Sequence, residues 1–192
     1  MRRSIIAVLL IGLVAGLAPS ANGVTLDVSI EGVAAGFSPP KLTIELGDQV
    51  RWTNADGINH TSTQSGPLGL WDSGPIDPGD TFSVTLGVAG TYPYRCNIHS
   101  VMTGRVRVPP QASILSNGGI KVVIASQAAQ NTFVFDVQRR DGNGNWQPWK
   151  DDITRRSVRF VPLNDGEYAF RARLQREGGG ASMWSPPVSV TV

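Results

Sequence analysis

Hydrophobic and polar positions alternate in short runs along the chain after residue 23. In Gln49–Asn54, for example, Val50 and Trp52 fall on one face of an extended strand, and Arg51 and Thr53 fall on the other. No stretch keeps a helical period over three turns, so the pattern indicates strands rather than helices. In the first half it predicts strands over Lys41–Leu46, Gln49–Asn54, Thr81–Leu86, Gly90–Arg95 and Gly104–Val108.

The second half shows the same pattern after an interruption. Pro109 and Pro110 remove two backbone donors and indicate a short, stiff linker over residues 109–112. Beyond it, alternating apolar residues predict half-buried strands around Phe135 and Phe170. We therefore expect an all-β protein with two β-sandwiches in series, a first domain over residues 24–108 and a second over residues 113–192.

The N-terminus differs from both halves. Arg2 and Arg3 precede an apolar run from Ile5 to Leu17, and small residues follow it up to Gly23. This order is typical of an export signal, so residues 1–23 are predicted to be a signal peptide and the mature protein to be periplasmic or secreted, with no membrane span after cleavage. An uncleaved membrane anchor is the alternative, but the apolar run is short for a bilayer.

Charge narrows the choice of partners. Without Arg2 and Arg3, the formal net charge of +2 falls to near neutrality. Residues 24–108 hold five Lys and Arg against eight Asp and Glu, whereas residues 109–192 hold ten against seven. Neither half forms the basic stripe that binding to DNA or RNA requires, so we expect no nucleic-acid partner.

The stretch "YPYRCNIHSVMTG" contains Cys96, His99 and Met102 at intervals of three, and the other histidine, His60, lies far upstream. Cys96 is the only cysteine, so it cannot form a disulfide within the chain. Along a strand, residues three apart point to opposite faces and lie roughly 10 Å apart. The chain must therefore turn after Cys96 if the three side chains are to meet.

A thiolate, two imidazoles and a thioether together favour copper. Zinc sites prefer Cys, His and carboxylate ligands, whereas a thioether suits Cu(I) and imidazole suits Cu(II). Cysteine and two histidines in a plane with a weak axial methionine form a blue-copper electron-transfer site. The alternatives are that the Cys-x-x-His spacing arises by chance and that Met102 only fills space in a core.

Four segments of the first half carry a family resemblance: "GFSPPKLTIELGDQVRWTN", "NH", "DSGPIDPGDTF" and "GTYPYRCNIHSVM". With these, residues 24–108 resemble the cupredoxins, in particular plastocyanin, pseudoazurin and amicyanin. The resemblance implies a Greek-key sandwich that binds one type 1 copper ion. It makes His60, Cys96 and His99 the equatorial ligands and Met102 the axial ligand, and it implies that Asn59 stiffens the ligand loops.

The second half contains no histidine or cysteine, which excludes Cys/His and Ser-His-Asp catalysis there. The stretch "LNDGEYAFRARLQREGGGASMWSPPVSVTV" resembles the closing strands of fibronectin type III domains, which belong to the immunoglobulin-like sandwiches, and the resemblance implies a corner tyrosine at Tyr168. Its arginines are interpreted either as solvated strand faces or as a docking surface: Arg139, Arg140, Arg155, Arg156, Arg159, Arg171 and Arg173.

These observations predict an exported blue copper protein, not an enzyme, that carries single electrons between a protein donor and a protein acceptor. The partners are expected to dock near His99, on an apolar patch formed by Ile98, Val101, Leu68 and Leu70, with Pro67 beside them. One alternative is a copper-binding protein for storage or delivery. Another is an adhesive or scaffolding protein in which the copper domain is an accessory.

Overall fold

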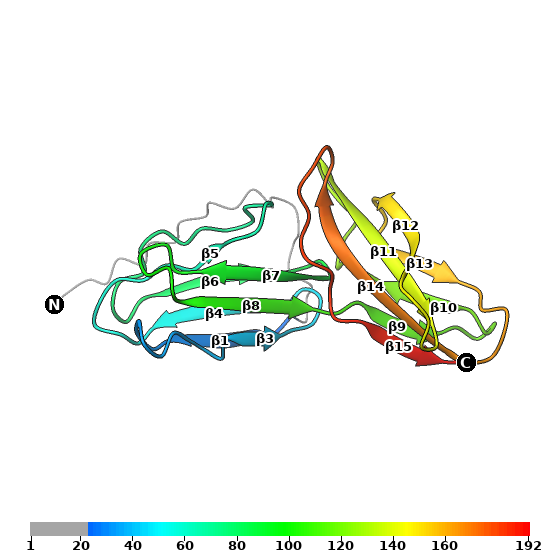
Figure 1. Cartoon of the computed structure of the whole chain (residues 1–192), viewed down its shortest axis with the longest axis horizontal. Coiled ribbons are helices and arrows are strands. Elements are labelled where there is room, and N and C mark those ends of the chain that lie inside the picture. Colours follow the sequence, from blue (N-terminus) through cyan, green and yellow to red (C-terminus); the bar gives the residue numbers. More distant parts are fainter. Residues whose placement is uncertain (1–22) are drawn as a thin grey trace.

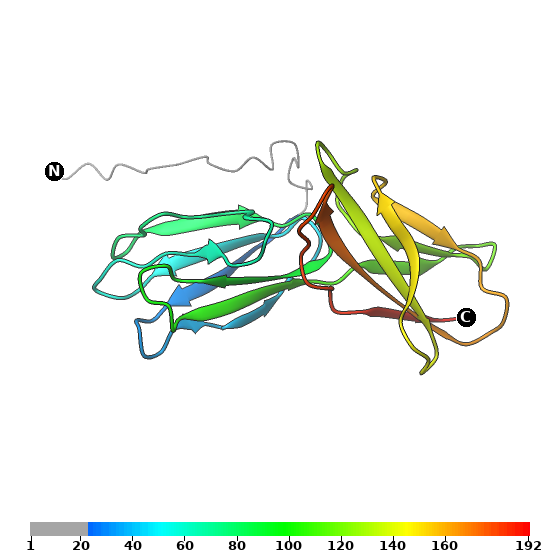
Figure 2. The same cartoon turned by 45° about the horizontal axis from the view of Figure 1, so that its top comes forward.

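The computed structural model describes residues 23–192 and shows two β-sandwiches in series (Figures 1 and 2). The predicted all-β architecture is confirmed. The predicted signal peptide lies outside the described residues, apart from Gly23. Within residues 23–192, no helix has the length and hydropathy needed to cross a membrane.

The first sandwich packs two four-stranded sheets face to face. One sheet has the order β2-β1-β4-β6 and the other β3-β8-β7-β5. Strand β1 runs parallel to β4, and β3 runs parallel to β8, while the other neighbours are antiparallel. The strands are β1 (Thr25–Ile30), β2 (Phe37–Ser38), β3 (Lys41–Thr43), β4 (Gln49–Asn54), β5 (Thr63–Gln64), β6 (Thr81–Thr85), β7 (Gly90–Arg95) and β8 (Thr103–Val108).

The inward faces of these strands form one aromatic core. Trp52 is fully buried at its centre, with its ring centroid 5.2 Å from that of Tyr94 and 5.8 Å from that of Trp71. Gly104 lies across from Tyr94 on β8, and a Cβ atom at this position would collide with the tyrosine ring. The aromatic side chains thus fill the space between the sheets and hold β7 against β8 and β4.

The second sandwich pairs a three-stranded sheet, β13-β10-β9, with a four-stranded sheet, β12-β11-β14-β15. Its core includes Phe135 and Phe170. The Tyr168 hydroxyl donates a hydrogen bond to the Asn164 carbonyl at 2.7 Å, which is the contact expected of a corner tyrosine. The strands are β9 (Gln111–Ile114), β10 (Ile120–Val123), β11 (Phe133–Asp141), β12 (Gln147–Ile153), β13 (Ser157–Phe160), β14 (Glu167–Arg176) and β15 (Val188–Thr191).

The connection between the sandwiches is shorter than the predicted linker. Strand β8 ends at Val108 and β9 begins at Gln111, so only Pro109 and Pro110 lie between them. Gln111 and Ala112, which the proline pattern places in the linker, pair instead with β10. Because the two prolines are stiff and β9 starts directly after them, the sheets that contain β8 and β9 have little freedom to move relative to each other.

The two sandwiches also make direct contacts at this junction. The amide of Ala89 donates to the Ile124 carbonyl at 2.8 Å, and Thr91 and Met183 exchange two backbone hydrogen bonds of 3.0 and 3.2 Å. Leu68, on a loop of the first sandwich, is buried in the core of the second. These contacts fix the second sandwich against one end of the first.

The opposite end of the first sandwich is free of the second. Strand β8 runs toward the junction and the antiparallel β7 runs away from it (Figure 1). With six residues in β7 and a rise of about 3.3 Å per residue, its end lies roughly 20 Å from the junction. Cys96 follows β7 directly, so the predicted metal ligands belong to this free end.

Candidate metal centre

Two loops at the free end of the first sandwich bring the predicted ligands together. Cys96 and His99 lie in the β7–β8 connection, with Met102 just before β8, and His60 lies in the β4–β5 connection. His60 is anchored to another loop by two backbone hydrogen bonds with Ile76, of 2.7 and 3.3 Å. The site is therefore built from segments that are distant in sequence but end at the same edge of the sandwich.

The chain turns after Cys96, as the spacing predicts. The Cys96 amide donates to the Met102 carbonyl at 3.0 Å, which closes the loop at its base. Inside it, the Met102 amide donates to the His99 carbonyl at 3.0 Å, and the His99 amide donates to the Cys96 sulfur at 3.4 Å. These bonds explain the interval of three, because each ligand position begins or ends a turn.

The donor atoms of His60, Cys96 and His99 form a small triangle. The Cys96 sulfur lies 3.9 Å from Nδ1 of His60 and 3.7 Å from Nδ1 of His99, and the two nitrogens are 3.2 Å apart. Metal–nitrogen distances near 2.0 Å and metal–sulfur distances near 2.3 Å place two ligands of one ion about 3–4 Å apart. The triangle therefore fits a single metal ion bound by all three atoms.

The fourth predicted ligand, Met102, is buried in the same region. Its side chain is 2% exposed and belongs to the core of the first sandwich, together with Cys96. Copper suits this donor set, since thiolate and thioether sulfur favour Cu(I) while imidazole is a good ligand for Cu(II). Among the described residues, His60, Cys96 and His99 are the one group of three or more His, Cys, Asp or Glu side chains whose donor atoms lie close enough to hold a metal ion.

Burial differs between the two histidines. His60 and Cys96 are fully buried, whereas His99 is half-buried and so has an edge at the surface. The Cys96 sulfur accepts hydrogen bonds from the amides of Thr61 at 3.3 Å and His99 at 3.4 Å. Amide donors of this kind stabilise a thiolate without an added charge.

The residue that stiffens the ligand loops is not Asn59. Its side chain is exposed and makes no hydrogen bond within residues 23–192. Thr61 takes that role on the other side of His60, since its hydroxyl accepts the Asn97 amide at 2.8 Å and so ties the two ligand loops together. The buried Asn54 donates to the carbonyls of Ile58 and Ile76, both at 2.8 Å.

Sequence reasoning also missed an acidic partner of His60. Oδ2 of Asp56 lies 2.9 Å from Nε2 of His60, the ring nitrogen that faces away from Cys96 and His99. The His60 ring and then the Gly57 amide hold the pKa of Asp56 below its usual value. The sequence did contain a signal for this contact: Asp56 precedes His60 by four residues, and the turn residues Asp56-Gly57 allow the chain to fold back between them.

The apolar patch near the centre differs from the predicted one. Ile98 and Val101 are exposed, as expected, with 50% and 74% of their surface accessible. Leu68 is 2% exposed, because its loop reaches back to the second sandwich. In its place, Val33 and Ile58 are exposed on loops that follow the parallel strands β1 and β4, at the same end of the sandwich.

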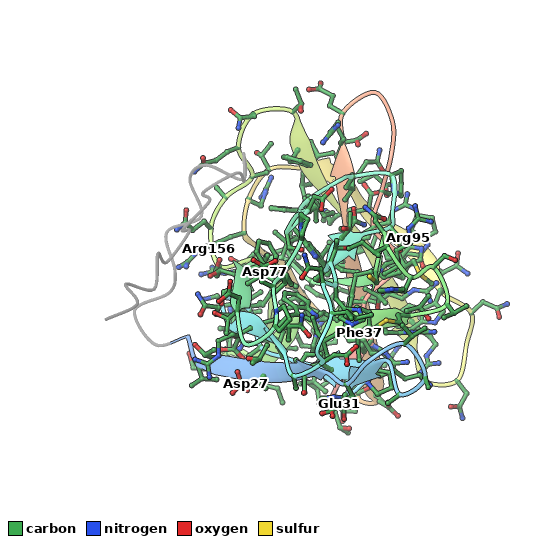
Figure 3. All side chains as sticks on the ribbon, turned by 90° about the vertical axis from the view of Figure 1, so that its left-hand side faces the viewer. Asp27, Glu31, Phe37, Asp77, Arg95 and Arg156 are labelled. Carbon is green, nitrogen blue, oxygen red and sulfur yellow. The ribbon has the colours of Figure 1, made fainter. Side chains whose placement is uncertain are left out.

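Figure 3 faces this end of the molecule, with Glu31, Asp77 and Arg95 on different segments around it. We define the exposed residues Val33, Ile58, Ile98 and Val101 as the end patch. The four exposed apolar residues and these charged side chains thus lie at the same end of the sandwich as the loop carrying His99. A surface of this kind can be covered by a partner and released again.

Comparisons with known proteins match part of the chain. Residues 24–109 match the family model for copper binding proteins of the plastocyanin/azurin family. The chloroplastic plastocyanin of Tetradesmus obliquus is 33% identical over 103 residues, which are 48% of this chain and 71% of that protein. Amicyanin-alpha of Methylorubrum extorquens is 37% identical over 75 residues, which are 38% of this chain and 63% of that protein.

Solved structures also match part of the chain. The Cu(I) form of an amicyanin with a single methionine-to-alanine substitution is 28% identical, with a TM-score of 0.41, and covers 44% of this chain and 81% of its own. A purple cupredoxin from Nitrosopumilus maritimus is 30% identical, with a TM-score of 0.39, and covers 43% of this chain and 97% of its own.

The copper-binding family model matches the sandwich that holds the buried triangle of one thiolate and two imidazoles. Copper is accordingly the cofactor, and residues 113–192 lie outside the family match. Through its first sandwich, the chain belongs to the plastocyanin/azurin family of copper-binding proteins.

Proposed function

We propose that this protein is an exported carrier of single electrons, with one type 1 copper ion held by His60, Cys96, His99 and Met102. The observation that carries the proposal is the triangle of donor atoms, which the β-scaffold and its loop hydrogen bonds hold at metal-binding distances. Bound copper supplies the Cu(II)/Cu(I) couple. The protein's part is to fix the ligands and to tune their electronic character.

The same rigidity favours carriage over storage or delivery. His60 and Cys96 are fully buried. Two backbone hydrogen bonds, and a third from the His99 amide to the Cys96 sulfur, set the shape of the loop that carries Cys96, His99 and Met102. Release of a metal ion from such a site requires the loop to open, whereas electron exchange requires no such motion. An enzyme is not favoured, because the chain has a single cysteine and no His-x-His segment, which the copper centres of multicopper oxidases and terminal oxidases need.

We propose that protein partners dock on the end patch, where the half-buried His99 gives the shortest route to the copper. The patch is apolar and lies at the end away from the second sandwich, so a partner can approach without hindrance from it. Changing Val101 to Asp should slow electron exchange with a small redox protein and leave the absorption spectrum unchanged. Equal exchange rates for the variant and the unmodified protein in stopped-flow mixing would show that partners dock on another surface.

The test of the copper site is the visible spectrum after addition of Cu(II) to the purified protein. We expect an intense band from thiolate-to-copper charge transfer, at one copper per chain. Cys96→Ser should abolish this band and keep the β-rich circular dichroism spectrum. Met102→Gln should keep the band and lower the reduction potential, because an oxygen donor favours Cu(II). A Cys96→Ser protein that stays blue would exclude Cys96 as the ligand.

A further inference from the structure

We propose that Asp56 is a positioning residue for His60 and that its negative charge lowers the reduction potential of the copper centre. The inference rests on the proposed function and adds a residue outside the four ligands. Three features of the described structure carry it: the contact between Asp56 and the ring of His60, the hydrogen bonds that hold Asp56 in place, and the lack of a basic side chain paired with it.

The contact selects one tautomer of His60. Nδ1 of His60 faces Cys96 and His99, at 3.9 Å from the sulfur and 3.2 Å from the other nitrogen. A ring nitrogen that binds a metal ion must offer its lone pair, so the ring proton belongs on the other nitrogen, Nε2. Nε2 lies 2.9 Å from Oδ2 of Asp56, and the N–H group can therefore donate to the carboxylate.

Asp56 is itself held in position. Its amide donates to Oδ1 of Asn54 at 3.0 Å, and its Oδ1 accepts the Gly57 amide at 2.7 Å. Gly32, with φ of +97°, passes over the carboxylate so closely that an added Cβ would lie 3.1 Å from Oδ2. One carboxylate oxygen is thus used by the turn, and the other is directed at His60.

The charge of Asp56 has no competing partner. Among the ion pairs of residues 23–192, Asp56 contacts the ring of His60 and no Lys or Arg side chain. His60 is fully buried, and 30% of the Asp56 side chain is exposed. A carboxylate beside a buried imidazole interacts more strongly than the same charge in open water, although its exposed part is screened.

A carboxylate that accepts the outer N–H group of a ligand histidine raises the basicity of the ligand. A more basic imidazole and a nearby negative charge both stabilise Cu(II) relative to Cu(I), which lowers the potential. No corresponding acid makes a hydrogen bond or ion pair with His99 in the described part of the chain. The two histidines therefore differ: His60 is the buried ligand with a charged partner, and His99 is the ligand at the surface.

The experiment compares Asp56→Asn with Asp77→Asn by voltammetry at pH 7. The amide in D56N keeps the shape of the side chain and an acceptor oxygen but removes the charge. Asp77 is an exposed carboxylate at the same end of the molecule (Figure 3), and its side chain makes no hydrogen bond within residues 23–192. We expect D56N to raise the equilibrium ratio of Cu(I) to Cu(II) by up to about tenfold, which is a rise of about 59 mV in the reduction potential for one electron. D77N should change this ratio far less. Asp56→Glu, which keeps the charge, should stay nearer to the unmodified protein.

A second measurement needs no copper. In the metal-free protein, nitrogen NMR shifts of His60 should show the tautomer with the proton on Nε2, and Asp56→Ala should give a mixture of tautomers. Equal potentials in D56N and D77N, with the blue band present, would overturn the role of Asp56 and leave the carrier function intact. If D56N does not retain copper, its potential cannot be measured, and the NMR experiment on the metal-free protein becomes the test. The proposal is then overturned if His60 keeps the same tautomer in Asp56→Ala. Absence of a blue band in the unmodified protein would instead overturn the proposed function.

Discussion

The two sandwiches share an architecture but place their chemistry differently. All the histidine and cysteine side chains of the chain lie in the first sandwich, and His60, Cys96 and His99 meet in loops at its free end. The second sandwich has no such group, and its distinctive side chains lie on a sheet face instead. The same strand pairing can thus support a reactive site at the ends of strands or an inert surface along them.

That sheet face carries a stack of arginine and tryptophan side chains. The Arg171 guanidinium lies 4.4 Å from the ring centroid of Trp146 and 5.2 Å from that of Trp184, and Arg173 lies 4.6 Å from Trp184. Each exposed cation–π contact is worth about 0.5–1 kcal/mol. Burial, followed by the nearby charge of Arg140, lowers the pKa of Arg171.

Of the seven arginines singled out in the sequence, Arg140, Arg171 and Arg173 therefore pack against indole rings and are not simply solvated. The stack joins strands β11 and β14 and is a structural feature of the second sandwich. Charge on this half of the chain therefore supports its own fold, whereas the charge of Asp56, at the end of the first half, faces the ring of His60, a proposed metal ligand.

Separating the sandwiches should have the largest effect. Residues 111–192 are expected to fold alone, to melt cooperatively and to ignore a chelator, because their core contains no metal ligand. Residues 24–110 alone should lose stability, since Leu68 and Val88 would be exposed at about 1.5–3 kcal/mol each. Calorimetry of both fragments tests this. A second half that does not fold alone would argue against the predicted domain boundary.

A single substitution at the junction should have the next largest effect. Leu68→Ala leaves a cavity where the first sandwich enters the core of the second, and we expect a loss of about 2–5 kcal/mol in the free energy of unfolding. The absorption spectrum should not change, because the proposed copper ligands lie at the other end of the first sandwich. Leu163→Ala, at a side chain that is 93% exposed, is the control. Equal losses in the two variants would show that the junction contributes little.

The smallest effect is expected from the substitution Tyr94→Phe. It should change the free energy of unfolding only at alkaline pH. Burial raises the pKa of Tyr94 from 10.0 to about 12, and a weaker interaction with Trp52 opposes the rise. The unfolded chain then loses the proton first, so stability is complete below pH 10 and falls as the pH rises toward 12, by about 1.4 kcal/mol per unit. Denaturant titrations of Tyr94→Phe should show a shallower fall in that window and no loss at pH 7. An identical slope would contradict this assignment.

The sequence predicted strands well where alternation was clear. Gln49–Asn54 and Gly90–Arg95 have the predicted bounds. Strand β1 (Thr25–Ile30) was missed, although its buried positions alternate toward its end, because its place depends on parallel pairing with β4. Asp136 is a charged residue on β11 and is nevertheless buried, because Arg173 pairs with it at 2.8 Å. Such pairings bring together residues that are distant in sequence, which local patterns do not record.

The metal centre shows the same limit. The intervals within Cys96–Met102 predicted the turn because the loop is local, and the types of residue predicted the metal. The supporting role of Asn59 came from the family resemblance, and it was wrong because the exposed side chain of Asn59 contacts neither ligand loop through a hydrogen bond within residues 23–192. Thr61 and Asp56 act through contacts to a second loop and to the far side of the ring, which follow from the fold.

The proline connection between β8 and β9 has a mechanical consequence. With two residues between the strands and backbone hydrogen bonds across the junction, bending at this point would break several contacts at once. The protein should therefore tumble as one elongated body. Val161 and Leu163, which are 72% and 93% exposed, belong to the β13–β14 connection, at the tip opposite the copper (Figure 1). Anything attached at that tip would hold the copper at a fixed distance and direction, so that rotation of the whole molecule is the motion that presents His99 to a partner.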